Sequence, residues 1–115
     1  MADQQFQLTD NAAQLFEQEN APKIGRPTAE LTFEHVSLHS GDRVLDVACG
    51  TGIVIRVALQ RFSNIRSIVG VDLNAGMLDV ARENTPTTDV PVEWKQGDMC
   101  ALPFPDGSFE VVLCQ

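Results

Sequence analysis

The fold of this chain is decided by the stretch VLDVACGTG at residues 44–52. Its first half is an apolar run interrupted only by Asp46, which is typical of a strand buried in a parallel sheet. Its second half is a loop of small residues that lets the backbone approach a ligand, and the free N–H groups of the following helix favour an anionic group such as a carboxylate. A plain strand-to-helix turn has a similar composition, so this stretch alone leaves a binding role open.

Strands and helices alternate on the C-terminal side of this stretch. Periodicity predicts strands at residues 43–48, 67–72, 90–96 and 109–114, separated by helices at residues 53–62 and 74–83. Pro91, which has no N–H to donate, favours an edge position for the third strand. With right-handed crossovers, these elements predict an α/β fold with a Rossmann-like, doubly wound parallel sheet and a ligand site at the carboxyl ends of its strands.

A helical segment at residues 1–40 is predicted to precede the α/β unit of residues 41–115. Asp10 can cap a first helix that ends near residue 19, Thr28 can cap a second that ends near residue 38, and residues 20–27 are expected to be a loop. The apolar residues at helical spacing, which are available for burial, are Ala12, Leu15 and Phe16 in the first helix and Leu31, Val36 and Leu38 in the second.

Composition restricts the function further. The net charge of −8 and the pI of about 4.5 argue against a nucleic-acid surface, because phosphate binding needs clustered basic residues. Three cysteines without paired spacing argue against a disulfide framework. The first twenty residues resemble no signal peptide and no long apolar run occurs, so we expect a soluble, cytoplasmic protein without membrane partners.

Two further motifs end later strands. Asp72 closes VGVD at residues 69–72, where a carboxylate can accept both hydroxyls of a ribose, although an N-cap or a solvated Asp would also fit. In QGDM at residues 96–99, Asp98 could accept a hydrogen bond from an exocyclic amine, and Met99 could contact a flat ring. Taken alone, these last two residues are more often a turn residue and a core residue.

A dinucleotide site is the main alternative for the small-residue loop. That fingerprint requires a small residue three positions after its second glycine, and Ile55 occupies the position counted from Gly52. The carboxylate of Asp46 ahead of the loop would also repel phosphates. An NAD(P)-dependent oxidoreductase is therefore the weaker interpretation.

Together, VLDVACGTG (44–52), VGVDLNAGML (69–78) and the segment from QGDM to the C-terminal residue (96–115) resemble the successive motifs of class I S-adenosylmethionine-dependent methyltransferases. The resemblance is greatest to the small-molecule branch akin to the ubiquinone and menaquinone C-methyltransferases, and it covers residues 41–115. It implies a seven-stranded sheet of order 3-2-1-4-5-7-6, of which this chain would supply the first four strands, in the order 3-2-1-4. The cofactor it implies is S-adenosyl-L-methionine.

The same resemblance implies roles for individual residues. The methionine part of the cofactor would be lined by Asp46, Ala48, Cys49, Gly50, Thr51 and Gly52. Asp72 would bind the ribose diol, Leu73 and Met77 would flank the adenine, Asp98 and Met99 would contact its edge and face, and Cys114 and Gln115 would lie near the amino group and the sulfonium. Ala48 departs from the family, which more often has glycine there, and this narrows the loop slightly.

The implied reaction is methyl transfer to a small-molecule acceptor, and no residue is a firm candidate for a catalytic base. A non-catalytic fragment that binds the cofactor or self-associates through the strand at residues 109–114 remains open. His35 and His39 are two potential ligands without a third, so no metal is expected. Arg26 could meet the methionine carboxylate, but a solvated loop arginine is favoured.

Overall fold

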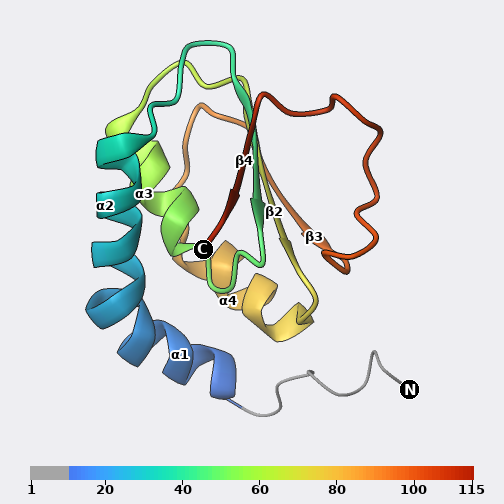
Figure 1. Cartoon of the computed structure of the whole chain (residues 1–115). Helices are drawn as coiled ribbons and strands as arrows, with labels where there is room; N and C mark the ends of the chain where they lie inside the picture. The colour runs from blue at the N-terminus through green and yellow to red at the C-terminus, as the bar shows by residue number, and fades with distance from the viewer. Residues whose placement is uncertain (1–10) are drawn as a thin grey trace.

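The computed structural model describes residues 11–115 as a four-stranded parallel sheet flanked by helices (Figure 1). In chain order the elements are α1 (Ala12–Asn20), the π-helix η2 (Ala21–Gly25), α2 (Arg26–His35), β1 (Arg43–Val47), α3 (Ile53–Arg61), β2 (Ser67–Asp72), α4 (Ala75–Asn84), β3 (Val92–Gln96) and β4 (Val111–Cys114). The strand order β3-β2-β1-β4, with every neighbouring pair parallel, confirms the predicted topology and the edge position of β3. β3 and β4 each begin two residues later than predicted.

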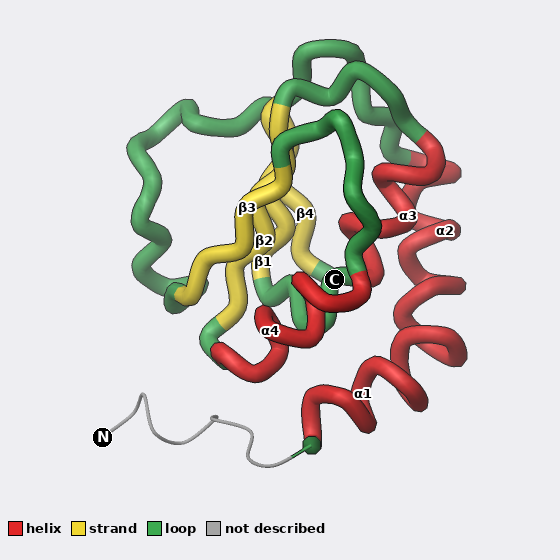
Figure 2. Tube along the Cα trace, turned by 180° about the vertical axis from the view of Figure 1, so that it is seen from behind, coloured by secondary structure: helices red, strands yellow, loops and turns green. Residues whose placement is uncertain are grey.

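Alternation along the strands gives the sheet two apolar faces. One face packs against the helices, with Val44 and Ile68 in its core. The other face contains Leu45 and Val69 and is covered by the long loop between β3 and β4 (Figure 2). Both central strands are therefore buried on both sides, as their continuous apolar sequence predicts.

The N-terminal helices differ from the prediction at their junction. Residues 20–27 are not a loop, because the π-helix η2 runs directly from α1 into α2. Pro22 is tolerated in its first turn, where a missing N–H leaves no bond unmade. Thr28 lies inside α2 and its hydroxyl donates to the carbonyl oxygen of Ile24 at 2.7 Å, so it is not a cap. The predicted cap Asp10 lies outside the described residues.

The predicted burial of these helices is also partly wrong. Leu15 is 50% exposed and Leu31 56% exposed, whereas Ala13, which was not singled out, is buried. Leu38 is buried as expected, although α2 ends before it. α1 turns Ala13 toward the protein, and the Ala13 methyl carbon lies 3.9 Å from the Cβ position of Gly76 on α4. A small residue permits this close helix contact, so the larger side chains of α1 face outward.

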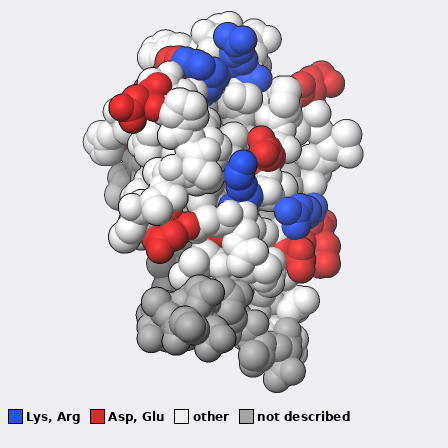
Figure 3. All heavy atoms as spheres, turned by 90° about the vertical axis from the view of Figure 1, so that its right-hand side faces the viewer, with Lys and Arg blue, Asp and Glu red and all other residues white. Residues whose placement is uncertain are grey.

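Charges are mixed on the surface that Figure 3 shows, where acidic and basic side chains are interspersed and neither sign forms a continuous patch. Within residues 11–115, no helix is long and apolar enough to cross a membrane.

The indole ring of Trp94 on β3 fills space that two glycines leave open. A Cβ atom at Gly70 would lie 2.8 Å from Trp94 Cε3, and one at Gly52 would lie 2.8 Å from Trp94 Cη2. Such distances are shorter than van der Waals contact. The edge strand is therefore packed onto both β2 and the start of α3 through one aromatic side chain.

We expect Gly70→Ala to destabilise the chain by roughly 1–3 kcal/mol, because the added methyl group overpacks the contact with Trp94. Urea unfolding of the wild type and the variant measures this free energy. When Gly70→Ala is introduced into a Trp94→Leu chain, it should lower the free energy of unfolding by less, since the smaller leucine side chain leaves room for the methyl group. An equal cost in both backgrounds would contradict the steric explanation.

Candidate functional site

The loop of residues 48–52 follows β1 and is hydrogen-bonded to the carboxyl end of β2. The Cys49 N–H donates to the carbonyl oxygen of Val71 at 2.9 Å, and the Gly50 N–H donates to Asp72 Oδ2 at 2.9 Å. Ala48, Gly50 and Gly52 all have positive φ, at 57°, 56° and 90°. A left-handed conformation costs a non-glycine residue about 1–2 kcal/mol, so Ala48 is strained.

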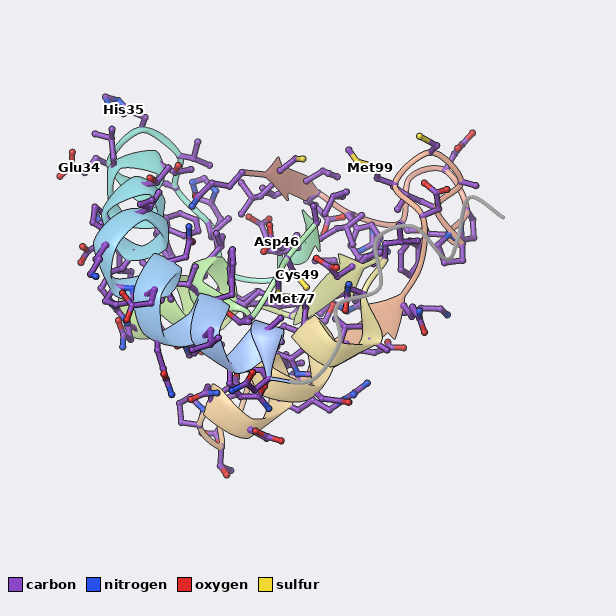
Figure 4. All side chains as sticks on the ribbon, turned by 90° about the horizontal axis from the view of Figure 1, so that it is seen from below. Glu34, His35, Asp46, Cys49, Met77 and Met99 are labelled. Carbon is purple, nitrogen blue, oxygen red and sulfur yellow. The ribbon has the colours of Figure 1, made fainter. Side chains whose placement is uncertain are left out.

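A pocket of about 100 Å³ opens beside this loop. Its lining residues are Phe16, Asn20, Gly25, Asp46, Ala48, Cys49, Gly50, Thr51, Ile53, Val54 and Gln115. Viewed toward the carboxyl ends of the strands, Asp46 and Cys49 lie near each other at the centre of the molecule (Figure 4). A volume of this size suits one polar group of a ligand rather than a whole drug-sized molecule.

The structure brings part of the predicted set together. The predicted residues that line the pocket are Asp46, Ala48, Cys49, Gly50, Thr51 and Gln115. Asp72 is joined to them through its hydrogen bond to Gly50, and Gly52 precedes the first residue of α3. Leu73 follows β2, its carbonyl oxygen accepts a bond from Gln96 Nε2 at 3.0 Å, and Met77 is half-buried in the first turn of α4.

Three of the predicted residues that do not line this pocket lie on the loop after β3 or on β4. Met99 lies on the loop after β3, well apart from Asp46 in Figure 4, and its side chain is exposed. Asp98 on the same loop accepts the N–H of Cys100 at 2.8 Å, which is a local turn. Cys114 on β4 is exposed, and it is paired with Val47 of β1 in the sheet. Their contact with a ligand stays a prediction.

The N-terminal helices supply pocket residues that sequence reasoning missed. Phe16 and Asn20 come from α1 and Gly25 from η2. The Gly25 carbonyl oxygen also accepts a bond from Gln115 Nε2 at 3.2 Å. The apolar spacing of Phe16 signalled a helix, but nothing in that spacing placed the helix at the end of the sheet.

Asp46 is the unusual group in this pocket. It is 1% exposed, and neither carboxylate oxygen has a hydrogen-bond partner among the described residues. Burial, together with the negative charge of Asp72, raises its pKa to about 7. The buried Thr51 hydroxyl, which also lines the pocket, likewise has no partner within residues 11–115.

Other groups offer less chemistry. Burial raises the pKa of the Cys49 thiol, so it is protonated at neutral pH. Arg26 is not in a loop: it begins α2, and its Nη1 donates to Gln60 Oε1 at 3.1 Å. Within the described range, no three His, Cys, Asp or Glu side chains form a cluster that could hold a metal ion. A larger cavity of about 310 Å³ lies under the loop on the other sheet face and includes none of the predicted site residues.

The Asp46 carboxyl should make stability depend on pH. Its pKa is about 7 in the folded chain and near the ordinary value of 3.8 in the unfolded chain, so the folded state binds more protons between these pH values. Stability therefore falls as the pH rises from about 4 to about 7, and the loss is complete above that range. One pKa unit corresponds to about 1.4 kcal/mol, so the total can reach several kcal/mol.

Asp46→Asn should remove this slope and stabilise the ligand-free chain at pH 8, because the neutral amide has a similar shape and no charge to desolvate. Urea unfolding at a series of pH values measures the difference between the two chains. Asp89→Asn, at an exposed position, serves as the control. Parallel pH profiles for wild type and Asp46→Asn would contradict the prediction.

Comparison with known proteins gives consistent matches. The chain is 41% identical over 76 residues to a demethylmenaquinone methyltransferase of Deinococcus radiodurans, which covers 66% of this chain and 31% of that protein. It is 42% identical over 74 residues to a ubiquinone/menaquinone biosynthesis C-methyltransferase of Xanthomonas campestris, which covers 63% and 29%. The matched segment is thus less than a third of these curated relatives' length.

A solved structure and a family model agree with these relatives. A chain in the complex of the Haloferax volcanii Trm112 methyltransferase activator with a putative methyltransferase is similar at a TM-score of 0.71 and 26% identity, covering 93% of this chain and 48% of that one. Residues 44–115 match the model of the family described as "Methyltransferase domain". This match includes β1, the loop after it and all later strands, and the chain therefore belongs to the methyltransferase domain family.

Proposed function

We propose that this chain binds S-adenosylmethionine at the carboxyl end of β1 and is the cofactor-binding part of an enzyme that methylates a small molecule. The observation that carries the proposal is the Asp46 carboxylate, which is buried at the pocket and whose two oxygens have no hydrogen-bond partner within residues 11–115. A buried carboxylate is costly unless a cation or a donor satisfies it. The ammonium group of the cofactor's methionine part is such a cation.

The remaining contacts follow the strand ends. We assign the methionine part to the loop of residues 48–52 and the ribose to Asp72. Each Asp72 oxygen accepts one backbone N–H, from Gly50 and Asn74, at 2.9 Å. Because each carboxylate oxygen has room for a further bond, a ribose diol can still be accepted. The proposed adenine contacts are Leu73, Met77, Asp98 and Met99, and Cys114 and Gln115 are proposed beside the amino group and sulfonium.

The chemistry requires little of the protein's own side chains. A bound sulfonium supplies an activated methyl group, which transfers by in-line displacement. The residues of this chain would bind and orient the reagent and exclude water from it. A covalent role for Cys49 is not proposed, since its thiol is buried and protonated.

We propose a small organic molecule as the methyl acceptor. The Deinococcus relative is named for a quinone-type substrate, so quinone precursors are the first compounds to test. The acidic net charge of −8 argues against a nucleic-acid substrate, and the three cysteines, free as thiols, suit a reducing cytoplasm. The alternative is a fragment that binds the cofactor without turnover, and failure to methylate any compound of the panel despite cofactor binding would favour it.

Calorimetric titration with S-adenosylmethionine tests the proposal, with NADH as the comparison ligand. We expect saturable binding of the first ligand only. Binding of NADH alone would favour the dehydrogenase alternative, and binding of neither by folded protein would contradict the proposed cofactor site in this chain.

Asp72→Ala should weaken S-adenosylmethionine binding about ten- to a hundredfold, because it removes charge-assisted hydrogen bonds to the ribose. Asp79→Ala, which removes an exposed carboxylate that pairs with Arg82 on α4, should leave the affinity unchanged. The unfolding midpoint of each variant is measured on the same sample, to separate lost contacts from unfolding. Equal affinities for wild type and a folded Asp72→Ala chain would refute the ribose assignment.

We also propose that the chain self-associates through β4. This strand is at the sheet edge and carries Val112, which is 58% exposed. Exposed apolar edges pair readily with other chains. Sedimentation of the wild type should show an oligomer that grows with concentration, and Val112→Lys should reduce it. A monomer at all concentrations would contradict this proposal.

A further inference from the structure

The guanidinium group of Arg56 is buried inside the protein, in the first turn of α3, with 8% of the residue exposed. Its Nη1 donates to the carbonyl oxygen of Thr51 at 2.6 Å. Its Nη2 lies 2.8 Å from both carboxylate oxygens of Glu17, whose side chain is 20% exposed. One buried cation therefore joins the loop after β1 to helix α1, over 39 residues of sequence.

Among the described residues, helix α1 has few other buried contacts. Ala13 is its one buried residue, while Leu15 is 50% and Phe16 36% exposed. A helix that buries little apolar surface opens locally at low free energy. In such a helix, a hydrogen-bonded charge pair contributes a large share of the attachment.

The same helix forms a wall of the pocket. Phe16 and Asn20 both line it, and Phe16 Cε1 lies 3.6 Å from the Cβ position of Gly50. Glu17 is adjacent to Phe16, so the bond that holds Glu17 also fixes the aromatic ring over the loop. The π-helix η2 follows α1 and leads directly into α2 (Figure 1).

We propose that the Arg56–Glu17 pair is a positioning device that fastens α1 over the glycine loop and holds this wall of the ligand pocket in place. Neither residue lines the pocket, so both act through Phe16, Asn20 and the Thr51 carbonyl. The consequence for ligand retention rests on the proposed cofactor binding. The fastening of α1 does not, and it is tested without ligand.

Hydrogen–deuterium exchange of the ligand-free chain tests the fastening. Glu17→Gln keeps the shape of the side chain but removes its charge, and α1 amides should exchange about tenfold faster, while β1 and α4 amides keep their rates. Glu19→Gln is a matched control, since Glu19 lies on the same helix and pairs with Lys23 in solvent. Unchanged α1 exchange in Glu17→Gln, or an equal change in Glu19→Gln, would overturn the proposal.

Ligand kinetics test the consequence. Stopped-flow dissociation of S-adenosylmethionine should be about tenfold faster from Glu17→Gln than from wild type, with little change in the association rate. Phe16→Ala should also speed dissociation without altering α1 exchange to the same extent. If the wild type binds no cofactor while Glu17→Gln still loosens α1, the proposed function fails and the fastening stands. If α1 loosens but dissociation is unchanged, the role in retention is overturned.

Discussion

The carboxylate of Asp72 joins the ends of the two central strands. Its Oδ2 accepts the Gly50 N–H and its Oδ1 accepts the Asn74 N–H, both at 2.9 Å. One side chain thus fixes the loop after β1 and the start of α4. Because three loop residues have positive φ, this turn needs such an external acceptor to remain in one conformation.

The second carboxylate of the site works against stability. Asp46 is aligned with Gly70 in the β1–β2 ladder and is buried without a hydrogen-bond partner in the part of the chain that the structure describes. An apolar residue there would continue the strand's pattern and avoid the desolvation cost. The unfavourable burial of a charge thus occurs at Asp46, which lines the pocket. Proteins commonly depart from the pattern of their core at functional sites.

The sheet was predictable from the sequence because its signals are local. Short stretches of sequence predicted the strands and the turn after β1: the apolar runs around Val44 and Ile68, the glycine loop, and Pro91 at the edge strand. The strand order then follows from right-handed crossovers. The two N-terminal helices were predicted, but the junction between them was not predictable in this way. Pro22 and Gly25 are typical of a loop, yet both lie in the π-helix η2. Gly25 packs so closely against Ile53 that a Cβ atom on it would lie 2.8 Å from Ile53 Cγ2. Contacts between segments far apart in sequence decide such a junction.

The same distinction separates the predicted and missed parts of the site. Asp46 and Asp72 were identified because motifs at strand ends have a fixed place in this topology. Phe16 and Glu17 were not, because their place depends on a partner 39 residues from Glu17, at Arg56. Arg56 lies between apolar neighbours in IVIRVAL, residues 53–59. A charged residue in the first turn of such an apolar helix indicates a buried guanidinium group. A buried guanidinium requires an acidic partner, and the N-terminal segment supplies Glu17 within reach.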